Sequence, residues 1–125
     1  MHSPLLDLPQ LQSFAMIGYE DYLDLLGDIT RDVPVHLEAI RAAVHAGNPE
    51  EFSSRVHTFR GMICYLGCIV LTRRLTEMEF HQRFAPDQHA AVHSELQDLW
   101  DRSLSAIKDW EKSVPGFAPP GGGAS

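Results

Sequence analysis

The chain has 125 residues, of which 44% are hydrophobic and 22% are charged, and this length and composition are typical of one soluble globular domain. Its formal net charge of −7, from 10 basic and 17 acidic residues without a Lys/Arg cluster, argues against a DNA- or RNA-binding protein and disfavours an anionic membrane surface. The sequence predicts a cytoplasmic protein for three reasons. It starts without a signal peptide, and it has no apolar run long enough to cross a membrane. Its two cysteines are too few and too close for a disulfide framework.

Residues 8–17 form the first predicted element. The stretch is rich in apolar residues, which predicts one or two helical turns, and Gly18 ends it. The leucines around it either cap one end of a helical bundle or mark a self-association surface: Leu5, Leu6, Leu8 and Leu11.

A long second helix follows. Between Tyr22 and Val44, hydrophobic residues recur at intervals of three and four, which is the period of an amphipathic helix. Because Pro34 removes one backbone donor inside this run, we expect a bend near residues 30–34 rather than two separate helices. Gly47 ends the helix as a C′ residue.

The third helix has the clearest start signal in the chain. Asn48 suits an N-cap, Pro49 suits the first helical position, and Glu51 stands where a capping box places its glutamate. We expect Gly67 to end this helix, although a kinked continuation into the next one is an alternative. Its predicted buried stripe is Phe52, Val56, Phe59, Ile63 and Leu66.

Two further helices complete the pattern. The fourth spans about residues 68–84 until Pro86 breaks it, and its inward residues are Leu71, Leu75, Met78 and Phe84. Asp87 can start a long fifth helix, in which Trp100 and Trp110 are core or hydrophobic-edge residues. The rest of its predicted buried side is Val92, Leu96, Leu99, Leu104 and Ile107.

The sequence therefore predicts an all-α protein, an antiparallel four-helix bundle with a short extra N-terminal helix. Residues 61–71 are also rich in β-branched and aromatic side chains and fit a buried strand, but no hairpin signal or partner strand occurs elsewhere. We expect the bundle to occupy residues 1–113 and the Pro/Gly-rich tail, residues 114–125, to be disordered.

One histidine stands apart from the buried stripe of the third helix. At 100° per residue the five apolar residues fall within about 80°, and His57 lies about 140° from the middle of that arc. Gly61 follows one turn later on the same face, and Arg60 lies between His57 and the core. The pattern predicts an exposed histidine with a cation beside it and, one helical turn later, a position without a side chain.

This combination favours a phosphoryl-accepting histidine. Glycine costs about 0.5–1 kcal/mol relative to alanine inside a helix, and at Gly61 it gains no packing, so it makes room for another molecule to approach His57. The guanidinium of Arg60 can hold phosphate oxygens. A neutral imidazole is available near pH 7 in an exposed histidine.

More of the chain resembles the histidine-containing phosphotransfer (HPt) domain of multistep phosphorelays. That family has a histidine, a basic residue three positions on, a glycine four on and a second glycine ten on, then a leucine and a Leu-Glu-like pair. The matching positions here are His57, Arg60, Gly61, Gly67, Leu71, Met78 and Glu79, and the likeness covers about residues 8–112.

The resemblance implies a phosphocarrier without an ATP site, in which His57 exchanges a phosphoryl group with the aspartate of a response-regulator receiver domain. A hybrid sensor histidine kinase is a further expected partner. No cofactor is expected in this chain, because the receiver domain would supply Mg²⁺. We expect a monomer that contacts neither nucleic acid nor a membrane.

Two alternatives stay open. The first is a phosphorylation-silent adaptor that docks receiver or kinase domains, which the bulky Cys64 and Tyr65 support because small residues are usual at these positions. Arg60 replaces the family's usual lysine, which keeps the charge and changes its geometry. The second alternative is a metal-binding bundle, with candidate ligands Cys64, Cys68, His81, His89 and His93.

Overall fold

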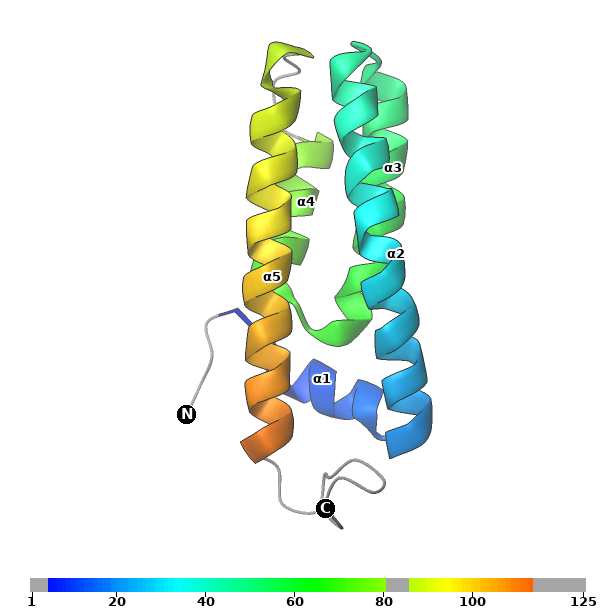
Figure 1. The fold of residues 1–125 in the computed structure, drawn as a ribbon, viewed down its shortest axis with the longest axis vertical. Coiled ribbons are helices and arrows are strands. Elements are labelled where there is room, and N and C mark those ends of the chain that lie inside the picture. Colours follow the sequence, from blue (N-terminus) through cyan, green and yellow to red (C-terminus); the bar gives the residue numbers. More distant parts are fainter. Residues whose placement is uncertain (1–4, 81–85, 114–125) are drawn as a thin grey trace.

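The computed structural model describes residues 5–80 and 86–113. Within these ranges the regular elements are all helical (Figure 1), which confirms the all-α prediction. The α-helices are α1 (Leu8–Ala15), α2 (Tyr19–His45), α3 (Pro49–Ile63), α4 (Ile69–Phe80) and α5 (His89–Ser113), and the short 3₁₀ turns are η1 (Cys64–Leu66) and η2 (Pro86–Gln88).

Helices α2, α3, α4 and α5 run side by side as a bundle, and the short helix α1 lies across one end (Figure 1). Helix α2 packs against α3 and α5, and α4 packs against α3 and α5, so the four form a closed ring. Helices α2 and α5 have 27 and 25 residues, whereas α3 and α4 have 15 and 12. At 1.5 Å per residue the long pair extends well past the short pair, and α1 with η1 fills the space left at that end.

One hydrophobic core runs the length of the bundle. The whole predicted stripe of the third helix is buried, and so are the predicted residues of α4 that the structure describes. In α5 the prediction is right for Val92, Leu96 and Ile107, while Leu99 and Leu104 are only half-buried. Trp100 and Trp110 are buried core residues, as expected, and Ser103 completes the stripe.

The turn between α2 and α3 forms as its sequence predicts, except for one contact. Gly47 has a φ of +69° after the end of α2, and the Asn48 side chain accepts a hydrogen bond from the Glu51 backbone at 3.0 Å. Glu51 does not complete a capping box, because its carboxylate pairs with Arg55 at 2.6 Å. The backbone N–H of Asn48 is already used, since it donates to the Ala43 carbonyl at 3.1 Å.

Gly67 ends the third helical segment and also anchors the N-terminal helix. Its φ of +70° is a left-handed conformation that favours glycine. Its carbonyl accepts a hydrogen bond from the Asp7 backbone at 2.7 Å, and a Cβ at this position would lie 2.5 Å from the Asp7 carbonyl oxygen. The glycine is therefore needed for both the turn and the close approach of α1.

Helix α2 continues past Pro34 as one element, which confirms the single long helix. The bend expected near residues 30–34 stays a prediction. The expected start of the last helix at Asp87 is wrong, because Asp87 lies inside the 3₁₀ turn η2 and α5 begins at His89. A proline at the head of a tight three-residue turn explains this delay.

Some predictions fall outside the described residues. These are the inward position of Phe84, the candidate ligand His81 and the disordered tail at residues 114–125. In the described part of the chain, none of the helices is both long and apolar enough to cross a membrane.

Candidate functional site

The structure places His57 on the outward-facing side of α3, as the helical periodicity predicts. It lies in the middle of α3 with 65% of its side chain exposed, while Val56 and Phe59 on the opposite face are fully buried. The buried stripe fixes the rotation of α3 in the bundle, and that rotation turns His57 outward.

Gly61 leaves open space one turn after His57. It is exposed and lies inside α3, and a Cβ added there would meet nothing within 4 Å. No close packing within the described chain therefore requires glycine at this position. The open space is available to another molecule that approaches His57.

Arg60 and Glu79 form a semi-buried ion pair beside His57. Glu79 reaches the site from α4, and the side chains of Arg60 and Glu79 are only 19% and 10% exposed. Arg60 Nη1 lies 2.9 Å from Glu79 Oε1, but the two are not aligned as a hydrogen bond, and this buried oxygen has no hydrogen-bond partner within the described residues. Glu79 Oε2 lies 3.2 Å from His57 Nδ1.

The guanidinium of Arg60 is held by its surroundings. Its Nη1 donates to Thr76 Oγ1 at 3.3 Å, its Nη2 lies 2.9 Å from His57 Nδ1, and its Cζ stands 5.7 Å from the centre of the Phe80 ring. Cation–π contact and the ion pair restrain the charge close to the imidazole. The sequence predicted the charge at this position but not these contacts.

The two contacts at Nδ1 exclude one another. If Arg60 donates to Nδ1, that nitrogen has the lone pair and Nε2 has the proton. If Nδ1 donates to Glu79, it has the proton and Nε2 has the lone pair. Nε2 has no partner among the described residues, so it is the ring nitrogen that another molecule can reach.

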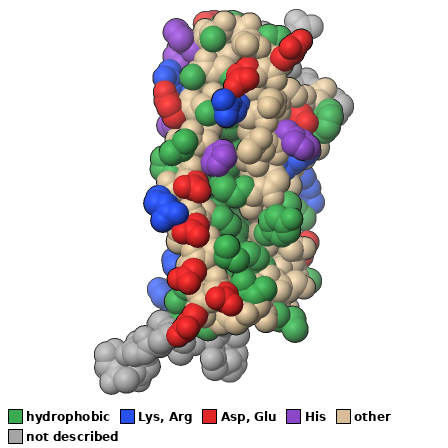
Figure 2. All heavy atoms as spheres, turned by 90° about the vertical axis from the view of Figure 1, so that its right-hand side faces the viewer, with side chains coloured by type: hydrophobic (Ala, Val, Ile, Leu, Met, Phe, Trp, Pro, Cys, Tyr) green, Lys and Arg blue, Asp and Glu red, His purple; other side chains and the backbone are tan. Residues whose placement is uncertain are grey.

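Exposed apolar side chains lie in the turn that follows α3 and at the end of α4. Tyr65 in η1 is 59% exposed and Phe80 at the end of α4 is 63% exposed, and Cys64 is also exposed. Figure 2 shows hydrophobic side chains gathered in the lower half of the face that lies on the right-hand side of Figure 1, with histidine side chains in the upper half. Exposed apolar surface of this kind is typical of a protein-docking face.

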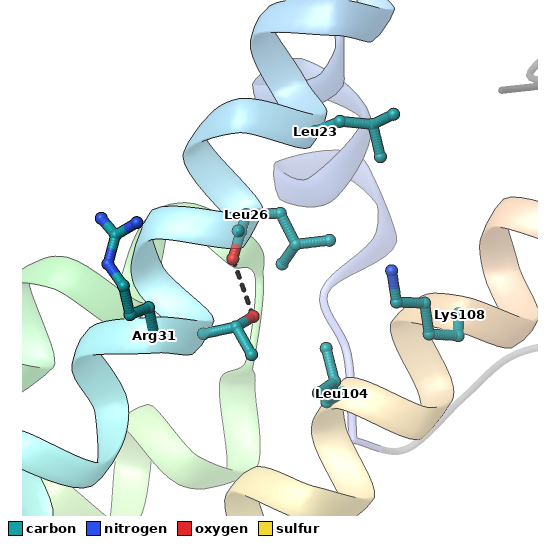
Figure 3. Close-up of a pocket in the computed structure, with 7 residues that line it drawn as sticks. Leu23, Leu26, Arg31, Leu104 and Lys108 are labelled. Carbon is teal, nitrogen blue, oxygen red and sulfur yellow. Dashed lines mark hydrogen bonds between the residues drawn. The ribbon is translucent and has the colours of Figure 1, made fainter. Parts of the chain in front are cut away.

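A separate hollow of about 360 Å³ lies between α2 and α5. Leu23 and Leu26 face Leu104 across it, and the Lys108 side chain points toward the same space (Figure 3). His57 stands on α3 beside α4, which is the other pair of helices in the ring. The hollow is therefore distinct from the histidine site.

The metal-binding alternative gains no support from residues 5–80 and 86–113. No group of three or more His, Cys, Asp or Glu side chains in these ranges is placed to hold a metal ion. The His89 ring packs against the His45 ring with centroids 4.5 Å apart. Cys64 is exposed whereas Cys68 is buried, and burial raises the pKa of the Cys68 thiol to about 12.

Comparisons with known proteins identify the family and the fold. The family model described as Hpt domain matches residues 24–110. The fold is similar to the crystal structure of histidine-containing phosphotransfer protein B from Pseudomonas aeruginosa PAO1, with a TM-score of 0.74 and 21% sequence identity, over 90% of this chain and 99% of that one. Among curated proteins, none matches this sequence.

Proposed function

Because this chain belongs to the Hpt domain family, whose members are phosphocarriers of phosphorelays without an ATP site of their own, we propose that His57 is its phosphoacceptor. The observation that carries the proposal is the exposed imidazole of His57, with Arg60 and Glu79 beside it and open space at Gly61. The phosphoryl group passes between His57 and the phosphorylated aspartate of a response-regulator receiver domain.

The transfer step uses the lone pair of Nε2. A bond forms between Nε2 and phosphorus while the bond from phosphorus to the aspartate oxygen breaks, and the aspartate leaves as a carboxylate with the electron pair. The imidazole gains positive charge and keeps its proton on Nδ1. The carboxylate of Glu79, 3.2 Å from Nδ1, compensates that charge, and the reverse step returns the lone pair to Nε2.

Arg60 supplies the positive charge for the phosphoryl oxygens. Phosphoryl transfer depends mainly on positioning and electrostatic stabilisation, and a semi-buried guanidinium beside the ring provides both. We propose that the receiver domain brings the Mg²⁺, since the described residues contribute one carboxylate to this site. Gly61 provides clearance for the receiver surface.

The partners and state of the chain follow the same proposal. A hybrid sensor histidine kinase is the second expected partner, and both use the face that carries His57. The chain acts as a cytoplasmic monomer, with residues 1–113 as the functional domain. Its exposed Cys64 and net charge of −7 fit a reducing compartment and a protein partner.

Labelling from a phosphorylated receiver domain tests the proposal. The wild type should acquire an acid-labile, alkali-stable phosphoryl group, and His57→Gln should abolish it with the fold unchanged, because an exposed side chain contributes little to stability. Labelling of His57→Gln would mean that another histidine is the acceptor.

The adaptor alternative predicts a different result in the same experiment. Tyr65 in η1 and Phe80 at the end of α4 expose apolar surface, and such a surface suits docking with or without phosphorylation. An adaptor would bind the receiver domain but remain unlabelled with every cognate receiver, whereas a phosphocarrier both binds and becomes labelled.

A further inference from the structure

We infer that Arg60 gates the proton of His57, an inference that rests on the proposed phosphoacceptor role. In the free protein Arg60 donates to Nδ1, which keeps the proton on Nε2 and makes that nitrogen unreactive. When a phosphoryl group draws the guanidinium away, Nε2 loses its proton to water and Nδ1 gains one from water. Glu79 then accepts the hydrogen bond from Nδ1, and the ring remains neutral.

The distances favour Arg60 as the partner of Nδ1 in the free protein. Arg60 Nη2 is 2.9 Å from Nδ1, whereas Glu79 Oε2 is 3.2 Å from it. The other arm of the guanidinium contacts Glu79 and Thr76, and the Phe80 ring lies against its carbon. The fork of an arginine therefore reaches the carboxylate and the imidazole at the same time.

Glu79 is positioned to accept a hydrogen bond from His57 Nδ1 when Arg60 moves away. Its Oε1 is buried beside Arg60 without an aligned hydrogen bond, so Arg60 does not fully satisfy this carboxylate. Its Oε2 already lies near Nδ1. Movement of Arg60, followed by the proton exchange with water, is sufficient to replace one partner of Nδ1 by the other.

A phosphoryl group is the ligand best able to draw the Arg60 guanidinium away from Nδ1. A guanidinium makes two charge-assisted hydrogen bonds to phosphate oxygens, which are stronger than one bond to a neutral imidazole nitrogen. The gate therefore releases the Nε2 lone pair when a phosphoryl donor arrives and keeps it protonated at other times. This couples the reactivity of an exposed histidine to its proper substrate.

Nitrogen-15 NMR of the free, full-length protein measures the two tautomers directly, at a pH where His57 is neutral. The wild type should have the proton mainly on Nε2. Arg60→Ala should reverse this and place it mainly on Nδ1, a change of about tenfold or more in the ratio, because the remaining partner is the charged Glu79. Arg60→Met, which keeps an apolar stem against Phe80, should give the same reversal if Arg60→Ala does not fold.

A matched control separates the gate from a general charge effect. Arg55 lies on the same helix, is half-exposed and pairs with Glu51, so Arg55→Ala should leave the tautomer ratio unchanged. A wild type with the proton on Nδ1, or an unchanged ratio in the Arg60 variants, would overturn the gate and leave the phosphoacceptor role intact. Failure of the wild type to become labelled would overturn that role, and the gate with it.

Discussion

Replacing Gly61 with alanine should make the free protein more stable and a poorer phosphocarrier. Gly61 is exposed inside α3, and its added Cβ would meet nothing within 4 Å. Glycine in a helix interior costs about 0.5–1 kcal/mol relative to alanine. Gly61→Ala should therefore raise the free energy of unfolding by about that amount.

The same methyl group should obstruct the receiver domain. Gly61 lies one turn from His57 on one face of α3, so a surface that brings an aspartyl phosphate to Nε2 must pass close to it. An extra methyl group in a closely packed contact costs about 1–3 kcal/mol, which corresponds to roughly a 5- to 150-fold loss in transfer at low receiver concentration. Gly61→Leu should lose more.

Two measurements and one matched control test this reasoning. Urea unfolding followed by circular dichroism gives the stability, and phosphoryl transfer from a receiver domain gives the activity. Gly27 is also exposed inside a helix with nothing within 4 Å of an added Cβ, but it lines the hollow on the far pair of helices. Gly27→Ala should gain similar stability without losing transfer. Wild-type transfer rates in Gly61→Ala and Gly61→Leu would refute the explanation of this glycine.

Three other predictions concern stability, charge and the thiols. Gly67→Ala should lower the free energy of unfolding by about 2–4 kcal/mol in a urea titration, because it combines a positive φ with a backbone clash; a loss below about 0.5 kcal/mol would contradict this. Arg60→Ala should slow phosphoryl transfer more than Arg60→Lys, since the charge matters more than the fork shape for the phosphoryl oxygens; equal rates would exclude an electrostatic role. Native protein should react rapidly with a thiol reagent at Cys64 alone, and two fast thiols would show that Cys68 is accessible.

The pH dependence of stability has a definite sign at Cys68. Burial raises the pKa of this thiol from 9.0 to about 12, so its neutral form stabilises the fold fully below pH 9. This contribution should be lost as the pH rises from about 9 to about 12, because the unfolded chain then releases its proton first. In urea titrations at several pH values, the free energy of unfolding should fall less steeply with pH in Cys68→Ala than in the wild type over this interval. The same slope in both proteins would show that groups other than Cys68 cause the loss of stability at alkaline pH.

The fold was predictable because it depends on patterns that are local in sequence. The apolar stripe of α3 fixed both its burial and the outward direction of His57. The contact between Asn48 and Glu51 spans only three residues, and its N-cap was predictable for the same reason. The unfinished capping box was not, because Arg55 competes for Glu51 and no propensity decides which partner wins.

The environment of His57 was less predictable because it depends on contacts between helices. Glu79 is 22 residues from His57, and its inclusion in the family pattern did not indicate which atom it contacts. A helical wheel of α4 could have placed Glu79 near the boundary of the buried face, but only the packing of α3 against α4 brings it to Nδ1. The anchoring of α1 at Gly67 is likewise a tertiary contact that its left-handed turn does not predict.

The charges around His57 suit a carrier rather than a store of phosphoryl groups. Arg60 and Glu79 form an ion pair beside the ring, so their two charges cancel one another. A phosphoryl group adds negative charge that Arg60 alone opposes among the site's residues, while Glu79 repels it and favours the proton on Nδ1. A second cation here would hold the phosphoryl group more strongly and slow its departure. In the proposed role of His57, one shared cation would let the group both arrive and leave, which transfer in a relay requires.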